Sequence, residues 1–296
     1  TVLLLTLSVC PQTFSQELEP RAYASAPVGL HAFLAVYSRS QGSVIFDPTL
    51  PIEDVTGTFN GTTLGYFQTI DFFGRSGNIG LSVPYAWGSM QGLVEGEFTR
   101  ITRSGLADPR LRLAFNLFGA PALTPKDFAG YRQKTNLGVS FTISAPLGQY
   151  DPAKLINVSA NRWAFKPELG VSHQTGRWLI EGAAGVWFTG DNSQFLGTST
   201  REQSRVLSLQ GHVIYNLPNR MWLGFDANFF NGGKIKVDGE ETGTPELRNS
   251  RFGATFSFPI HRRHSFKVLY DNGVITRLGT DFWKIAVAYQ FVWLGL

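Results

Sequence analysis

The sequence predicts an all-β fold, a single transmembrane antiparallel β-barrel of about 12 strands with no plug domain. Segments of about ten residues alternate between bulky apolar and small or polar side chains, which is the period of a strand with two different faces. Charged residues make up only 16% of the chain, below the roughly 25% of soluble domains, and the chain holds 24 Phe and 32 Gly. Outside the N-terminus no stretch approaches the ~18 apolar residues of a spanning helix, so any membrane crossing uses strands.

The alternation is clearest between residues 136 and 189. Leu137 and Val139 take the bulky positions there, and Ser140 and Thr142 take the small polar positions between them. In a soluble sandwich the bulky faces would meet in a core, whereas in a membrane barrel they face lipid and the polar faces line the lumen. The remaining strands decide between these two folds.

The predicted strands follow one another along the whole chain. They are residues 30–37, 63–73, 79–87, 110–117, 136–145, 164–172, 178–189, 204–216, 221–230, 249–258, 266–271 and 283–293. We expect short turns after the second, sixth, eighth and tenth strands and longer loops after the odd-numbered ones, with a longer connection after the fourth as the exception. A loop containing Asp47, Pro48 and Pro51 follows the first strand, and a polar loop after the third strand reaches Asp108.

Short turns at one rim and long loops at the other are the organisation of bacterial outer-membrane barrels. Trp163, Trp178, Trp283 and Trp293 lie at the ends of strands, where aromatic girdles meet the membrane interfaces. The last strand is rich in aromatic residues, and outer-membrane assembly machinery recognises such C-terminal strands. We therefore expect the cell outer membrane as the location, with its lipid and its assembly machinery as partners. A secreted soluble β protein is the alternative.

The N-terminus is expected to be a processing segment. Residues 1–15 have the apolar character of a secretory signal peptide, and the missing Met and basic start indicate a truncated sequence. We expect cleavage near Ser15, although a lipoprotein site at Cys10, the only cysteine, is the alternative. Residues 16–29 form a polar leader too short for a plug, and residues 30–296 form the barrel.

Ten charged residues are predicted to point into the lumen, and six are basic, which favours anionic or carboxylated solutes. They are Arg110, Arg112, Lys166, Glu168, Glu181, Asp226, Arg251, Lys267, Asp271 and Lys284. They form either a salt-bridged interior that holds the barrel together or a ladder that guides polar solute groups. We expect neighbouring strands to bring opposite charges within reach, as for Lys166 and Glu181, and for Asp271 and Lys284.

Trp187, Trp222 and Phe230 occupy polar-face positions and are predicted to be lumen aromatics. Such rings can stack on a flat solute, or they can simply fill a barrel of this size. Asp108, before Pro109, is expected to form a turn or to begin a strand at the outer rim.

His212 raises the question of catalysis, because some outer-membrane phospholipases are twelve-stranded. Their chemistry needs a serine and an orienting polar partner beside a histidine on the lipid side, whereas His212 is predicted to face inward. We therefore expect no enzyme activity, no cofactor and no metal site, although His261 and His264 have a metal-like spacing. A net charge of +4, dispersed along the chain, also argues against nucleic acid as a partner.

Three motifs carry a family resemblance. Residues 104–109 read SGLADP, residues 137–150 read LGVSFTISAPLGQY and residues 161–170 read NRWAFKPELG. Together they resemble the outer-membrane transporter family of the meta-pathway of phenol degradation, over roughly residues 27–293. The resemblance implies an outer-membrane channel for passive uptake of small hydrophobic or aromatic compounds, and with the basic lumen it suggests aromatic acids. A non-transport outer-membrane barrel, either structural or phospholipase-like, is the alternative.

Overall fold

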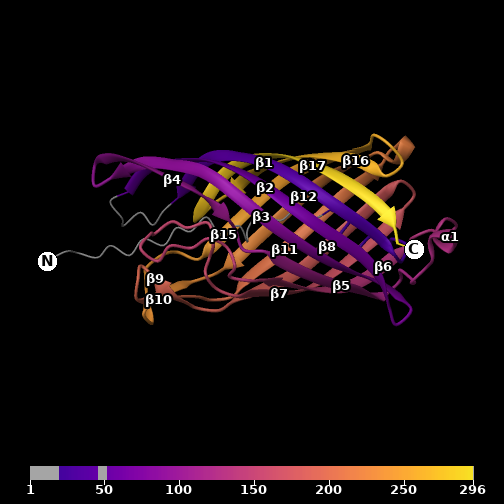
Figure 1. The fold of residues 1–296 in the computed structure, drawn as a ribbon, viewed down its shortest axis with the longest axis horizontal. Helices are drawn as coiled ribbons and strands as arrows, with labels where there is room; N and C mark the ends of the chain where they lie inside the picture. Colours follow the sequence, from indigo (N-terminus) through magenta and orange to yellow (C-terminus); the bar gives the residue numbers. More distant parts are fainter. Residues whose placement is uncertain (1–19, 46–51, 296) are drawn as a thin grey trace.

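The computed structural model describes residues 20–45 and 52–295 of the 296-residue chain. The predicted signal peptide with Cys10 and Ser15, and the predicted loop residues Asp47, Pro48 and Pro51, lie outside these residues. The described residues form an antiparallel barrel (Figure 1) with almost no helix. No helix in the described part of the chain is long and apolar enough to cross a membrane.

Thirteen strands form the barrel sheet. They are β1 (Leu30–Ile45), β2 (Ile52–Phe72), β3 (Arg75–Val94), β4 (Glu97–Leu106), β5 (Arg110–Phe118), β6 (Thr135–Ser144), β7 (Ala164–Thr175), β8 (Trp178–Thr189), β11 (Val206–Asn216), β12 (Trp222–Gly232), β15 (Leu247–Pro259), β16 (His264–Ile275) and β17 (Gly279–Leu294). Because β4 and β5 both pair with β3 and continue one another, they share one position, and pairing of β1 with β17 closes the barrel. The predicted twelve-stranded barrel is therefore confirmed, and the described residues contain no plug domain.

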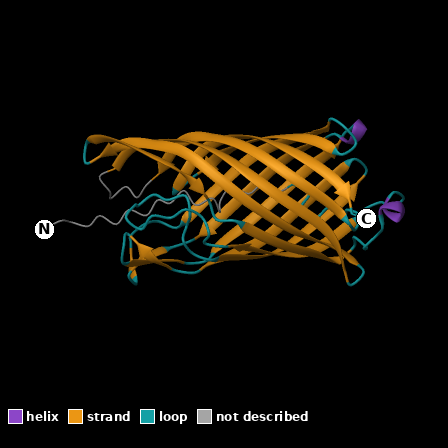
Figure 2. Ribbon diagram, viewed as in Figure 1, coloured by secondary structure: helices purple, strands orange, loops and turns teal. Residues whose placement is uncertain are grey.

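The elements outside the barrel sheet lie at its two rims (Figures 1 and 2). A small sheet contains β9 (Asn192–Phe195), β10 (Ser199–Gln203), β13 (Ile235–Val237) and β14 (Glu240–Glu241). This sheet and the loop of residues 145–163 belong to one rim, the loop rim. The opposite rim, the short-turn rim, holds α1 (Pro125–Phe128), the 3-10 turn η2 (Pro218–Arg220) and the C-terminus.

Two predicted loops are wrong. The segment before Asp108 forms β4, which pairs with residues 85–94 of β3. In this strand Ile101 and Arg103 are half-buried, whereas Thr102 between them is exposed. The connection between β3 and β4 is consequently only residues 95–96, and the one between β16 and β17 is only residues 276–278. Strands β1 to β3 also run well beyond the predicted segments, since threonine, serine and glycine continue the strands where apolar alternation ends.

Side chains divide into an exposed apolar face and a buried polar face. On the outside, Phe225 is 60% exposed and Phe252 is 55% exposed. On the inside, Thr255, Ser208 and Ser144 are buried, although each is polar. A soluble sandwich would bury the bulky face, so this inverted distribution indicates a lipid-facing exterior around a polar interior.

Candidate functional site

Residues 20–29, the N-terminal segment, enter the lumen at the short-turn rim. The backbone N–H of Arg21 donates to Glu181 Oε2 over 2.5 Å, and the Tyr23 hydroxyl donates to Glu168 Oε1 over 2.9 Å. Asn136 Nδ2 donates to the Tyr23 carbonyl over 3.0 Å. From residue 20 onwards the predicted polar leader is therefore an ordered part of the lumen, although it is too short to form a domain.

Sequence reasoning missed Arg21 and Tyr23 as lumen residues. Tyr23 is buried over Gly138 and Gly170, which lie directly opposite each other in β6 and β7. A Cβ atom at position 138 would lie 2.8 Å from Tyr23 Cδ1, so only glycine leaves room for the ring there. Two glycines on the lumen face of neighbouring strands are the sequence feature that could have indicated a close approach.

Glu168 is the centre of one lumen charge cluster. Lys166 Nζ lies 3.1 Å from Glu168 Oε2 on the same strand, and Arg112 Nη2 lies 3.8 Å from Glu168 Oε1. The Arg112 guanidinium also lies 5.4 Å from the centre of the Tyr23 ring. This cluster therefore ties β5 and β7 to the N-terminal segment.

Asp271 is the centre of a second cluster. Lys284 Nζ lies 2.9 Å from Asp271 Oδ2, as expected from the sequence, and Arg251 Nη2 lies 2.6 Å from Asp271 Oδ1. Arg251 Nη2 also donates to the Phe282 carbonyl over 2.5 Å. The buried carboxylate is thus compensated by two cations, which is the arrangement that a buried ion pair requires.

His212 belongs to a third cluster, together with Asp226 and Thr255. His212 Nδ1 donates to Asp226 Oδ1 over 2.7 Å, and the Thr255 hydroxyl donates to Asp226 Oδ2 over 2.7 Å. The Thr255 hydroxyl therefore contacts the carboxylate and not the imidazole. A nucleophilic hydroxyl is activated by a histidine that lies between it and the carboxylate, and here the carboxylate lies between the hydroxyl and the histidine. All three residues are buried in the lumen, as His212 was expected to be.

A cavity of about 880 Å³ lies beside these clusters. Its lining reaches from Lys284 and Asp271 to the turn residues Arg262 and Arg263, so it extends to the short-turn rim. Part of its wall is the N-terminal segment. Among the described residues, eight lysines and arginines and two aspartates line it, and both aspartates belong to the clusters described above. The described part of its lining is therefore mainly cationic.

The predicted lumen aromatics separate into two environments. Trp222 lines the cavity and also packs with Leu179 and Ile214 in a buried apolar cluster. Trp187 and Phe230 are fully buried and pack with Val206 and Ala164 in an apolar cluster. Lys166 Nζ and Arg110 Cζ lie 5.3 Å and 5.9 Å from the Trp187 ring centre. Of the three rings, Trp222 is therefore the one placed to touch a solute in this cavity.

Part of the barrel interior near the loop rim is apolar, although buried polar residues such as Arg162 and Arg201 belong to the same rim. Val44, Val55, Met90 and Phe282 form a buried cluster, against which Ile156 of the 145–163 loop packs. These residues come from β1, β2, β3 and β17. Phe282 lies nearer to the loop rim than Lys284 on β17, so the cluster lies on the loop-rim side of the Asp271 network. A solute that enters from the loop rim would meet this apolar cluster before it reached the cavity.

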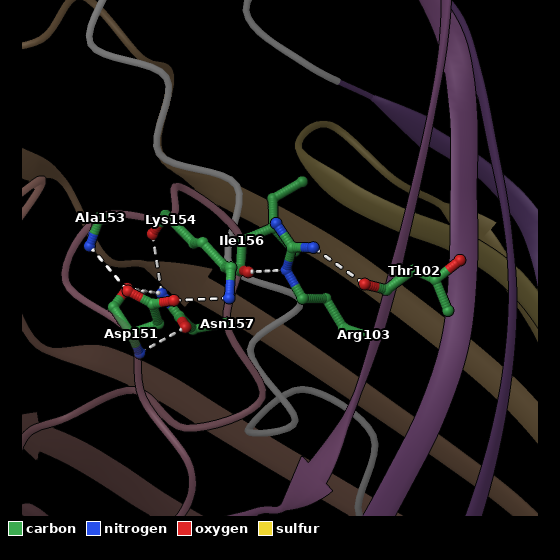
Figure 3. Close-up of polar contacts among 7 residues, drawn as sticks. All are labelled: Thr102, Arg103, Asp151, Ala153, Lys154, Ile156 and Asn157. Carbon is green, nitrogen blue, oxygen red and sulfur yellow. Dashed lines mark hydrogen bonds and ion pairs between the residues drawn. The ribbon is translucent and has the colours of Figure 1, made fainter.

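The 145–163 loop is held by polar contacts to β4 and within itself (Figure 3). Arg103 Nε donates to the Ile156 carbonyl over 2.7 Å. Lys154 Nζ lies 2.5 Å from Asp151 Oδ2, and its hydrogen bond lowers the pKa of the Asp151 carboxyl below the ordinary value. Asn157 closes the loop through Nδ2, which donates to the carbonyls of Asp151 and Lys154.

Asp108 anchors the other end of the same loop. Its Oδ1 accepts hydrogen bonds from the Ser159 hydroxyl over 2.6 Å and from the Gly148 N–H over 3.1 Å. Its Oδ2 accepts one from the Ala160 N–H over 2.9 Å. Asp108, which follows β4, therefore fastens the beginning and the end of this loop to the barrel.

Within the described residues no cluster of three or more potential metal ligands occurs.

The apolar exterior, the closed strand order and the polar lumen define an outer-membrane β-barrel of the channel class, located in the bacterial outer membrane. The sequence model of the family described as "Putative MetA-pathway of phenol degradation" matches residues 49–273. The chain belongs to this family, which confirms the resemblance of its motifs. None of the curated proteins compared with the chain matches it.

Solved structures show the same architecture. An outer membrane channel from Pseudomonas putida F1 matches with a TM-score of 0.75 at 17% identity, over 94% of this chain and 100% of that chain. The transport unit of the autotransporter AIDA-I from Escherichia coli matches with a TM-score of 0.53 at 10% identity, over 97% of this chain and 95% of that one. The β domain of the Bordetella autotransporter BrkA has a TM-score of 0.50 at 12% identity, covering 89% and 99%. The short-turn rim of such barrels is periplasmic.

Proposed function

We propose that this protein is a passive channel for small hydrophobic or aromatic compounds, aromatic acids among them. The observation that carries the proposal is the cavity of about 880 Å³, which combines a cationic lining with an apolar wall. Leu34, Val36, Phe67 and Leu269 contribute apolar side chains to this wall. A cavity of this size matches the sites that hold small organic ligands.

The path above the cavity supports the same class of solute. The buried cluster around Phe282 and Met90 gives part of the interior near the loop rim an apolar surface, against which a strongly hydrated solute would lose water without compensation. A solute with an apolar body avoids this cost. The proposal takes outer-membrane lipid as the surroundings of the exposed apolar face, and the outer-membrane assembly machinery as a partner during insertion.

Reconstitution tests the proposal. Purified protein in liposomes is expected to admit benzoate and toluene-sized neutral solutes faster than protein-free liposomes, and to give discrete single-channel currents in planar bilayers. Influx no faster than in protein-free liposomes would contradict the channel proposal. It would favour instead the alternative of a structural barrel, whose paired lumen charges serve stability alone.

A further inference from the structure

Lys267 is a lumen cation for which the described part of the chain provides no carboxylate partner. It lies on β16 and lines the cavity. Among the described residues, the lumen carboxylates Glu168 and Asp271 are bonded to other cations, and none lies within ion-pairing distance of Lys267. A charge removed from bulk water without a counter-ion is costly, so an anion from outside the chain would be favoured there.

A second cation converges on the same place. Lys267 Nζ lies 5.9 Å from the centre of the Trp222 ring, and Arg21 Cζ of the N-terminal segment lies 5.5 Å from it. Arg21 Nη1 donates to Asn216 Oδ1 over 3.1 Å, and the remaining N–H groups of the guanidinium are the ones that would meet an anion. The register explains the meeting, since Ser257 is the direct neighbour of Trp222 on one side and of Lys267 on the other. The Ser257 side chain between them is small, and all three residues line the cavity.

An apolar strip runs sideways from Lys267. Leu269 is the next inward residue on β16 and faces Ala286 across the β16–β17 pairing. Ala288 of β17 faces Val36 of β1, which continues the strip into the β1 side of the cavity. A ligand with an anionic head and an apolar body could therefore place its head at Lys267 and its body along this strip.

We propose that Lys267, Arg21 and Trp222 form a carboxylate subsite for amphiphilic monocarboxylates inside the lumen. The ammonium and guanidinium groups pair with the carboxylate, since charge-assisted hydrogen bonds from both are strong. The indole stacks on the adjoining ring or chain, and the body of the ligand lies along the Leu269–Ala288 strip. This subsite rests on the proposed function, because it gives the channel a preference for acids over neutral isosteres.

The test compares two isosteric probes that differ in charge, 4-fluorobenzoate and 4-fluorobenzamide. Fluorine NMR of each probe with purified protein in a non-ionic detergent measures both dissociation constants. Wild type is expected to bind the acid about tenfold more tightly than the amide, which is the range of one charge-assisted hydrogen bond. Lys267→Met is expected to lose this preference while keeping its affinity for the amide, and Lys267→Arg is expected to retain it.

Two further variants keep the test decisive. Arg177→Met removes a positive charge from the same rim but outside the cavity lining, and it is expected to keep the preference. Ser257→Asp places a carboxylate between Trp222 and Lys267, so it is expected to abolish the preference even if Lys267→Met fails to fold. A preference that survives in Lys267→Met or in Ser257→Asp overturns the subsite, as does an equal affinity of wild type for both probes.

Influx into liposomes separates this proposal from the channel proposal. Equal influx of the acid and the amide, together with equal binding, overturns the subsite and supports the channel. Absence of influx with an intact binding preference overturns the channel and supports the subsite as a binding site.

Discussion

The ring of Tyr23 lies against the bare backbone of Gly170, so closely that a Cβ atom at position 170 would overlap the ring. This contact seats the N-terminal segment against β7, and the Tyr23 hydroxyl adds hydrogen bonds to Glu168 and Ser140. A ten-residue segment without secondary structure of its own thus narrows the lumen through one aromatic residue and one glycine.

Gly170→Ala is expected to displace Tyr23 and to increase single-channel conductance. Keeping the ring in place against the new methyl group would cost about 1–3 kcal/mol, as overpacking does. Gly182→Ala is the matched control, because its Cβ would meet the nearest atom at 3.9 Å on the neighbouring strand. Tyr23→Ala is expected to raise conductance similarly, and the double variant is expected to add nothing further. Wild-type conductance in Gly170→Ala would show that the segment does not limit the current.

Phe256→Arg is expected to block assembly, whereas Thr255→Arg is expected to be much milder. Phe256 points outward from β15, and an arginine on the lipid face costs about 2–4 kcal/mol near the membrane midplane. Thr255 lines the cavity beside Asp226, so an arginine there can extend into water and keep a carboxylate nearby. Heat-modifiable mobility on gels measures the folded fraction. Equal loss in both variants would contradict the assignment of the two faces.

Trp222→Ala and Trp187→Ala are expected to have different effects. Trp222 lines the cavity, so its loss is expected to shift the ratio of benzoate to hexanoate influx by about the 0.5–1.5 kcal/mol of an aromatic contact. Trp187 is 2% exposed within an apolar cluster, so its loss is expected to cost about 3–5 kcal/mol of stability. Urea unfolding in detergent and paired influx assays measure the two quantities. An unchanged influx ratio in Trp222→Ala would assign that ring to packing.

Acid is expected to loosen the 145–163 loop. The hydrogen bond from Lys154 holds the pKa of Asp151 below its ordinary value, so the ion pair stabilises the loop above the ordinary pKa of about 3.9. This contribution is lost as the pH falls through the lower, folded-state pKa. Protection factors of the loop amides from hydrogen exchange are expected to drop in that window. Asp151→Asn is the control, and it is expected to show lower protection at neutral pH without the acid step.

The alternation of side chains predicted the barrel and the facing of its strands well, because one face of each strand meets lipid and the other meets the lumen. It underestimated the lengths of β2 and β3, and it predicted a loop where the structure has β4. At their outer ends these strands leave the lipid, so their outward residues no longer need to be apolar. Thr102, for example, is polar although it is an exposed residue of β4, so the segment lacks the apolar alternation that marks the other strands.

The sequence by itself determined the fold class, the number of barrel strands, the two faces and the family, since each follows from local periodicity or from short motifs. Sequence reasoning anticipated the pair of Asp271 and Lys284, but tertiary structure decided the other charge partners. Lys166 pairs with Glu168 on its own strand, and Glu181, the partner expected for Lys166, accepts from the Arg21 N–H. Strand register placed Lys267 beside Ser257 and Trp222, and register depends on contacts between residues distant in the chain. The position of Tyr23 was likewise decided in three dimensions, because a polar leader has no pattern of its own and takes its place from the glycines that it meets.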